Sequence, residues 1–223
     1  MSIDEALDRA ESAVRDGHGL SGTGFWPAVA QLRQNSVLAV RYGGRVADID
    51  RRAFEQGVRM RLPIGVGAGA LTLGTLLGVA AVVVAARLEH VPQAIVLLAG
   101  FVLLLLSTHA LAHLVVGRLF GIGFTHVFVA GRPPEPGVKI DYASYLRTPP
   151  MRRAVMHASG AVVSKIVPFA LIPVAMRMDA WPGVSWILAA IGVISIFADV
   201  FLSTKVSDWK RFRRELRAAR QPR

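Results

Sequence analysis

The chain has 223 residues, of which 53% are hydrophobic and only 18% are charged, yet its formal net charge is +11. This composition excludes a disordered chain, which needs low hydrophobicity. It also excludes an ordinary nucleic-acid-binding protein, because the basic residues lie between long apolar runs and form no single basic surface. The absence of cysteine excludes thiolate metal sites, disulfides and cysteine nucleophiles. Any metal ion must therefore be bound by histidine, aspartate or glutamate.

The N-terminal segment, residues 1–62, is predicted to be a helical, peripheral region on the cytoplasmic side of a membrane. Two charged stretches within it, Ser2–Arg15 and Val46–Arg61, are amphipathic at helical spacing. The glycine-rich stretch 17–24 interrupts the pattern between them. We expect this segment to lie against the lipid headgroups.

Four apolar segments follow, and each is long enough to cross a membrane as a helix, which takes about 20 residues. The expected fold is therefore an all-α polytopic membrane protein with about four transmembrane helices, in a core over residues 63–204. The predicted spans are about residues 64–86, 91–117, 154–176 and 180–204.

A small β-hairpin is predicted between the second and third spans, within residues 121–142. Two short β-like runs, residues 124–130 and 138–142, flank the turn-rich stretch 131–137. Exposed strand edges cannot lie in hydrocarbon. The hairpin must therefore lie at the cytoplasmic interface or be buried in protein.

The distribution of basic residues predicts the orientation. Residues 1–62 contain nine arginines, the loop 118–153 contains six basic and two acidic residues, and the tail 205–223 contains eight basic and two acidic residues. The positive-inside rule then puts this loop and both termini in the cytoplasm. The composition suits a multi-pass protein of a prokaryotic inner or cytoplasmic membrane. The basic tail is expected to bind anionic lipid headgroups.

The strongest chemical signal is the pair His109 and His113 in the second span. The two residues are four apart, so they share one helix face, and two imidazoles on one face can bind one zinc ion. The alternative is that both form hydrogen bonds with other helices. Asp199 and Asp208 lie near the cytoplasmic end of the fourth span, at the membrane depth of the histidines. Two histidines and one carboxylate leave a zinc position open, as in catalytic sites.

The order of these groups resembles the site-2 protease family of intramembrane zinc metalloproteases. The stretch 109–113 is similar to the family's H-E-x-x-H motif, the stretch 156–161 to the start of its middle core helix, and the stretch 199–211 to its last motif. The resemblance covers about residues 64–211. It implies hydrolysis of peptide bonds in membrane-embedded substrates, and it puts Asp199 where the family has an asparagine. It implies three zinc ligands, His109, His113 and Asp208.

The first motif departs from the family at Ala110, where the family has its catalytic glutamate. That carboxylate activates the attacking water and shuttles its proton, and an alanine can do neither. General acid–base catalysis contributes about 10²–10⁴ in rate, so we expect the chain as written to be inactive as a peptidase. The sequence leaves open whether Ala110 is natural or was introduced in place of glutamate.

Two other functions fit the same residues. One is a non-catalytic pseudoprotease that binds a metal ion or a client transmembrane helix and cleaves nothing, even as an Ala110→Glu variant. The other is a haem-binding membrane protein, in which His157 at the start of the third span pairs with His109 or His113. Small residues in the first span also permit a homo-oligomer.

Lys165, near the middle of the third span, needs a partner inside the membrane. Asp199 is the predicted partner, and the alternatives are backbone carbonyls or a side chain that extends to the interface. If the pair forms, Asp199 is a structural group, and Asp208 becomes the better candidate for the third metal ligand.

Overall fold

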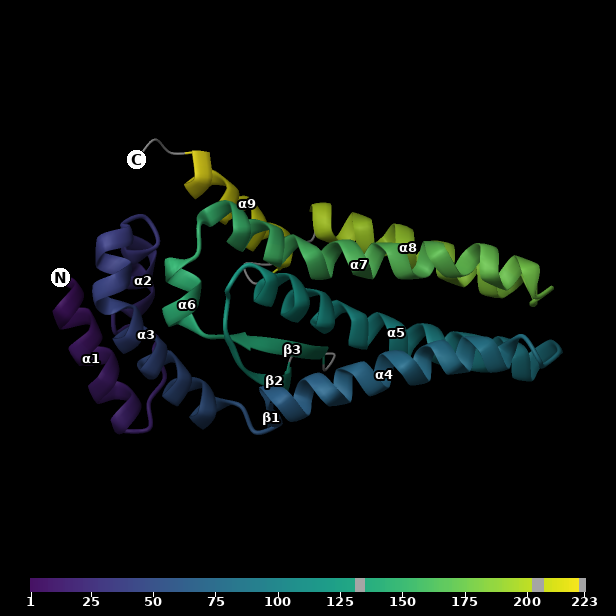
Figure 1. Ribbon diagram of the computed structural model, residues 1–223, viewed down its shortest axis with the longest axis horizontal. Helices are drawn as coiled ribbons and strands as arrows, with labels where there is room; N and C mark the ends of the chain where they lie inside the picture. Colours follow the sequence, from purple (N-terminus) through teal and green to yellow (C-terminus); the bar gives the residue numbers. More distant parts are fainter. Residues whose placement is uncertain (131–134, 202–206, 221–223) are drawn as a thin grey trace. The chain divides into compact units, whose positions relative to one another are not determined.

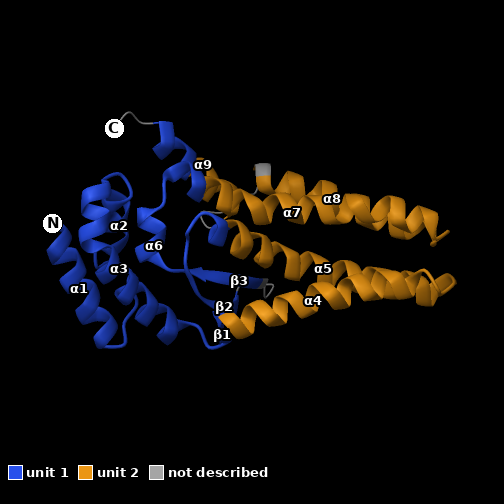
Figure 2. Ribbon diagram, viewed as in Figure 1, with its two compact units in different colours: residues 1–64, 117–153, 215–223 blue, residues 65–116, 154–214 orange. Residues whose placement is uncertain are grey.

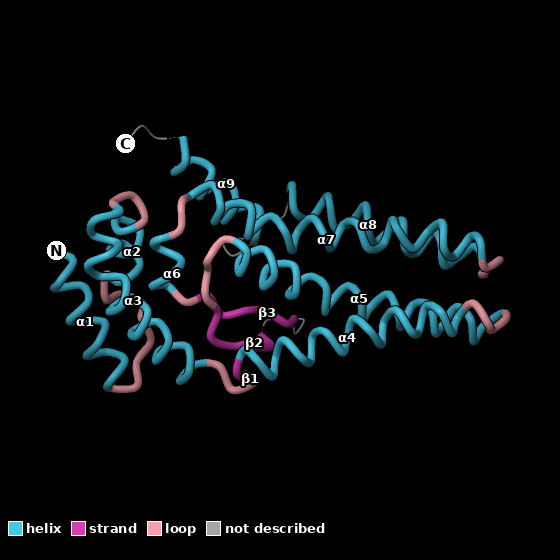
Figure 3. The backbone as a smooth tube through the Cα atoms, viewed as in Figure 1, coloured by secondary structure: helices cyan, strands magenta, loops and turns pink. Residues whose placement is uncertain are grey.

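The computed structural model describes residues 1–130, 135–201 and 207–220 (Figure 1). The chain divides into two compact units (Figure 2). The first consists of residues 1–64, 117–153 and 215–223, and the second of residues 65–116 and 154–214. Most of the described chain is helical, with one small sheet (Figure 3).

The first unit begins with three helices, α1 (Ile3–Arg15), α2 (Phe25–Leu32) and α3 (Ser36–Gly57). Ser2 and Glu5 form a capping box at the start of α1. A serine followed three residues later by a glutamate favours this arrangement. The predicted helix at residues 46–61 is only partly correct. Helix α3 begins earlier because Asn35 caps it, and it ends at Gly57 because Val58 is extended.

The sheet of the first unit has three antiparallel strands in the order β1 (Arg61–Pro63), β2 (Phe124–Ala130) and β3 (Glu135–Ile140). The predicted hairpin is confirmed as β2 and β3, whereas β1 was not predicted. Strand β3 stops before residue 142 because Asp141 caps the short helix α6 (Tyr142–Arg147). Residues 131–134 of the predicted turn lie outside the described residues.

A buried charged cluster also lies in the first unit. The carboxylate of Glu215, which is 1% exposed, forms an ion pair of 3.0 Å with Arg153 and accepts a hydrogen bond of 3.0 Å from the Tyr145 hydroxyl. Arg33 approaches the same carboxylate at 3.8 Å. Burial raises the pKa of the Tyr145 hydroxyl, and the nearby Glu215 carboxylate raises it further. The basic tail thus contributes an acidic residue to the interior of this unit.

Four helices are long and apolar enough to cross a membrane, and they make up most of the second unit. The protein is therefore an all-α, multi-pass membrane protein, as predicted. Helix α7 begins at Pro150, four residues before the predicted span, and a proline suits a first helical position. Residues 202–204 of the last predicted span lie outside the described residues. The helices are α4 (Ile64–Ala85), α5 (His90–Leu119), α7 (Pro150–Arg177) and α8 (Pro182–Phe201).

Close contacts at glycines hold these helices together. A Cβ atom on Gly78 of α4 would lie 2.8 Å from the Cγ atom of Leu104 on α5, and one on Gly100 would lie 2.9 Å from the carbonyl oxygen of Gly78. A Cβ atom on Gly192 of α8 would lie 2.7 Å from the ring of Phe169 on α7. Small residues let helix backbones approach in this way in membranes. Helix α4 therefore packs closely on α5, and α8 packs closely on α7.

Candidate metal centre

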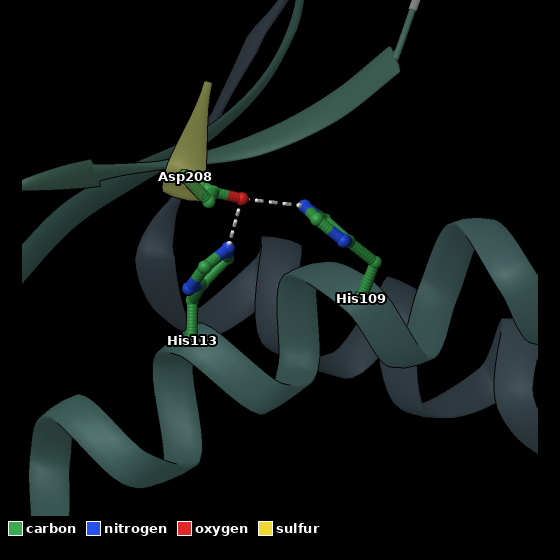
Figure 4. Close-up of side chains that lie close together, drawn as sticks. All are labelled: His109, His113 and Asp208. Carbon is green, nitrogen blue, oxygen red and sulfur yellow. Dashed lines mark hydrogen bonds and ion pairs between the residues drawn. The ribbon is translucent and has the colours of Figure 1, made fainter. Parts of the chain in front are cut away.

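Three of the predicted site residues converge in the second unit (Figure 4). His109 and His113 lie one turn apart on α5, and Asp208 is the first residue of α9 (Asp208–Arg220). The Oδ2 atom of Asp208 is 3.0 Å from Nε2 of His113 and 3.4 Å from Nε2 of His109. One potential ligand atom from each residue lies within 4.8 Å of the other two. Residues 95 positions apart in the sequence therefore form one group.

The orientation of His113 is fixed by the backbone of α7. Its Nδ1 atom lies 2.8 Å from the carbonyl oxygen of Met156. A carbonyl oxygen can only accept a hydrogen bond, so Nδ1 is the nitrogen that carries the proton. In the neutral ring, Nε2 then has a free lone pair, and this lone pair faces Asp208.

The orientation of His109 is fixed through Ser164. The Ser164 hydroxyl oxygen is 2.8 Å from the carbonyl oxygen of Gly160, so its single proton is donated there. Nδ1 of His109 lies 2.7 Å from the same hydroxyl oxygen, which must accept the hydrogen bond. Nε2 of His109 is therefore also unprotonated in the neutral ring. Both tautomers follow from the hydrogen-bond network.

With both rings neutral, the two Nε2 atoms and the Asp208 carboxylate are acceptors that face one another, so a cation must hold the group together. That cation is either a metal ion or a proton on a histidine, whose Nε2 then donates to Asp208. The two imidazole nitrogens and the carboxylate oxygen are the ligand types that zinc takes when chain residues supply three of its four positions. The bonds from Nδ1 to Met156 and Ser164 are of the kind that orients metal-binding histidines. The residues present could therefore hold a metal ion.

Gly160 gives His113 the space for its position. A Cβ atom at residue 160 would lie 2.2 Å from Nε2 of His113 and 2.7 Å from two carbons of the same ring. The imidazole therefore packs directly on the backbone of α7. Met156, Gly160 and Ser164 follow one another at intervals of four, so they form one row on α7. No role of Gly160 or Ser164 was predicted from the sequence, although their spacing of four on one helix could have indicated it.

The Asp208 carboxylate is ionised, as a metal ligand must be. Burial raises its pKa, but the hydrogen bond from a protonated His113, the charges of both histidines in their protonated form and the nearby Arg211 together lower the pKa to about 2. Arg211 lies one turn further along α9, with Nη1 3.9 Å from Oδ1 of Asp208. This leaves the Oδ2 atom of Asp208 directed at the two histidines.

The remaining candidate residues lie outside this group. Lys165 and Asp199 form an ion pair, as predicted, so Asp199 is occupied as a structural partner. His157 is buried on α7 and does not supply one of the three clustered ligand atoms. Ala110 is completely buried. Of the two aspartates considered from the sequence, Asp208 is the one that the structure brings to the histidines.

Comparison with protein-family models, with curated proteins and with solved structures gives no match. The resemblance to the site-2 protease family therefore rests on the residues of the three motifs. The clustering of two histidines and an aspartate is a separate observation, and it does not depend on that resemblance.

Proposed function

We propose that this chain is an intramembrane zinc-binding protein, similar in plan to a site-2 protease but without peptidase activity. His109, His113 and Asp208 hold the metal ion, and both termini lie in the cytoplasm. The observation that carries the proposal is the pair of fixed tautomers, which directs two imidazole lone pairs and a carboxylate at one point. A zinc ion held there supplies a Lewis acid with an open coordination position.

The lack of a free carboxylate near the site, among the acidic residues of the second unit, supports the non-catalytic part of the proposal. The second unit contains four acidic residues, Glu89, Asp179, Asp199 and Asp208. Asp199 is paired with Lys165, and Asp208 is a metal ligand in this proposal. Glu89 precedes α5, and His109 lies 19 residues into that helix, about 28 Å further along its axis.

Asp179 is equally remote from the site. It follows the end of α7, 19 residues after Gly160, and so lies about 28 Å along that helix from the row that contacts the histidines. Hydrogen-bond reach is about 3 Å. None of these carboxylates is therefore available to move a proton at the site, and position 110 offers only a methyl group.

Metal analysis of the purified protein tests the metal site. We expect one zinc per chain in the parent protein and a loss of zinc in His109→Ala and Asp208→Ala. His90→Asn is the matched control, because His90 lies at the start of the same helix with its side chain 90% exposed. A parent protein without zinc would overturn the proposal. A haem absorption band in the visible spectrum would support the haem-binding alternative instead.

A peptidase assay on an Ala110→Glu variant tests the catalytic part separately. We expect no cleavage of a membrane-embedded peptide, because Ala110 is completely buried and a larger, charged side chain there must displace its neighbours. Ala110→Gln has the same size without the charge and controls for the effect of bulk. If the glutamate variant cleaves the peptide and the glutamine variant does not, the chain is a peptidase that lacks only its catalytic glutamate.

A further inference from the structure

A cavity of about 360 Å³ lies in the second unit, apart from the residues of the metal site. Three helices line it: α7 through Lys165, α8 through Ile196, and α9 through Trp209, Phe212 and Arg213. The rings of Trp209 and Phe212 meet edge to face, with their centroids 5.4 Å apart. Small-molecule sites have volumes of about 300–1,000 Å³. This cavity is therefore large enough for part of a lipid.

The lining combines an apolar wall with one uncompensated positive charge. Ile196, Trp209 and Phe212 supply the apolar wall. The charge of Lys165 is balanced by Asp199. Arg213 is exposed and, within the part of the chain that the structure describes, forms no ion pair. An occupant that matches this lining has an apolar part and an anionic group, and a guanidinium binds phosphate oxygens with paired hydrogen bonds.

The position of the cavity in the chain points to a membrane lipid. It lies where the last spanning helix, α8, is followed by α9, a helix with six basic and two acidic residues. Basic amphipathic helices lie in the membrane interface, where tryptophan is enriched. The cytoplasmic leaflet there carries anionic headgroups. Lipid phosphate and acyl carbons are thus available to this cavity at high local concentration.

We propose that the cavity binds a single anionic phospholipid. The phosphate lies on Arg213, and the first carbons of an acyl chain lie against Ile196, Trp209 and Phe212. The basic tail was expected to contact anionic lipid, and the proposal locates that contact in a defined site. It makes no use of zinc, so the two proposals can fail independently.

Fluorescence of Trp209 measures occupancy directly. The other three tryptophans, Trp26, Trp181 and Trp186, are 47%, 61% and 77% exposed, so each can be replaced by phenylalanine. The full chain in detergent micelles is then titrated with a phosphatidylglycerol that carries bromine on its acyl chains. We expect saturable quenching by this lipid, weaker quenching by brominated phosphatidylcholine, and no competition from inorganic phosphate.

Two charge-matched variants separate a defined site from a basic surface. Arg213→Gln should weaken phosphatidylglycerol binding by roughly ten- to hundredfold, as expected for a lost charge-assisted hydrogen bond. Arg217→Gln removes an exposed charge that does not line the cavity, and should weaken binding by no more than about fivefold. Zinc content and helix content should stay unchanged in both variants.

Four outcomes would overturn the proposal. Equal effects of the two variants would mean diffuse electrostatic attraction, and equal quenching by phosphatidylcholine would mean an apolar surface only. Displacement of the lipid by inorganic phosphate would mean a simple anion site. Relief of quenching by a transmembrane peptide, without any dependence on the lipid headgroup, would mean a site for a client helix.

Discussion

Replacing Gly160 by alanine should abolish metal binding without unfolding the helix that carries it. In the present structure, a Cβ atom at this position would lie 2.2 Å from Nε2 of His113, whereas ordinary contacts of such an atom begin at 3.4 Å. The imidazole must therefore withdraw by about 1.2 Å, the difference between these distances. The hydrogen bond of 2.8 Å from Nδ1 to Met156 opposes this movement.

The displacement is large on the scale of metal coordination. Zinc–nitrogen distances are about 2.0–2.1 Å, and a functioning site keeps them within about 0.2 Å. A ring displaced by more than 1 Å is no longer a ligand. The loss of an orienting partner alone reduces metal affinity by about 10–100-fold, so the Gly160→Ala variant should lose at least about 100-fold.

Zinc affinity, measured by competition with a chelating dye, is the readout, and circular dichroism reports whether the helices persist. Gly69→Ala is the matched control, because Gly69 lies within helix α4 and a Cβ atom there meets nothing within 4 Å. Alanine favours the helix over glycine by about 1 kcal/mol at either site. Parental zinc affinity in the Gly160→Ala variant would refute the packing argument and, with it, the assigned position of the His113 ring.

Three further predictions concern the surroundings of the site and the first unit. Ser164→Ala should lower zinc affinity by about 10–100-fold, whereas Ser195→Ala, whose hydroxyl donates to the carbonyl of Gly192 on its own helix, should not; equal affinities would contradict the tautomer assignment. Lys165→Met should destabilise the protein by about 2 kcal/mol in a detergent unfolding assay, a value between those for exposed and buried ion pairs. Adding Asp199→Asn to this variant should restore part of the lost stability. Because the pKa of Tyr145 is raised in the folded state, stability should be retained below the ordinary pKa of 10.0 and fall as the pH rises above it. In a variant with Tyr42→Phe and Tyr142→Phe, which leaves Tyr145 as the single tyrosine, tyrosinate absorbance that appears before unfolding would contradict this.

The membrane helices and the histidine pair could be predicted from the sequence because both patterns are local. A run of about 20 apolar residues can form few structures in lipid other than a helix, since every backbone N–H and C=O group must find its hydrogen-bond partner within the segment. The spacing of four between His109 and His113 fixes their shared face by helix geometry alone. Helix α2 was missed because it is short and follows Gly24, whose φ of 85° belongs to the left-handed region.

Other features were not readable because they depend on contacts between distant segments. Strand β1 has three exposed residues and exists through its pairing with β2, more than 60 positions later. Glu215 lies in a basic stretch and gave no sign that it is buried against Arg153. The choice between Asp199 and Asp208 came from a family resemblance, because no periodicity relates either residue to a helix about 90 positions earlier.

Two histidines at a spacing of four are weak evidence for a metal site, because many helices contain such a pair by chance. The stronger evidence is a second row on α7, at the same spacing of four, that fits the first. In this row Met156 and Ser164 take the Nδ1 proton of one histidine each, and Gly160 leaves room for the ring of His113. A buried histidine needs such partners whether or not it binds a metal ion, but this row uses the Nδ1 atom of both histidines and so leaves both Nε2 atoms facing Asp208. Substitutions in the row therefore test whether the site is organised for a metal ion, whereas removal of a ligand tests only whether that ligand is needed.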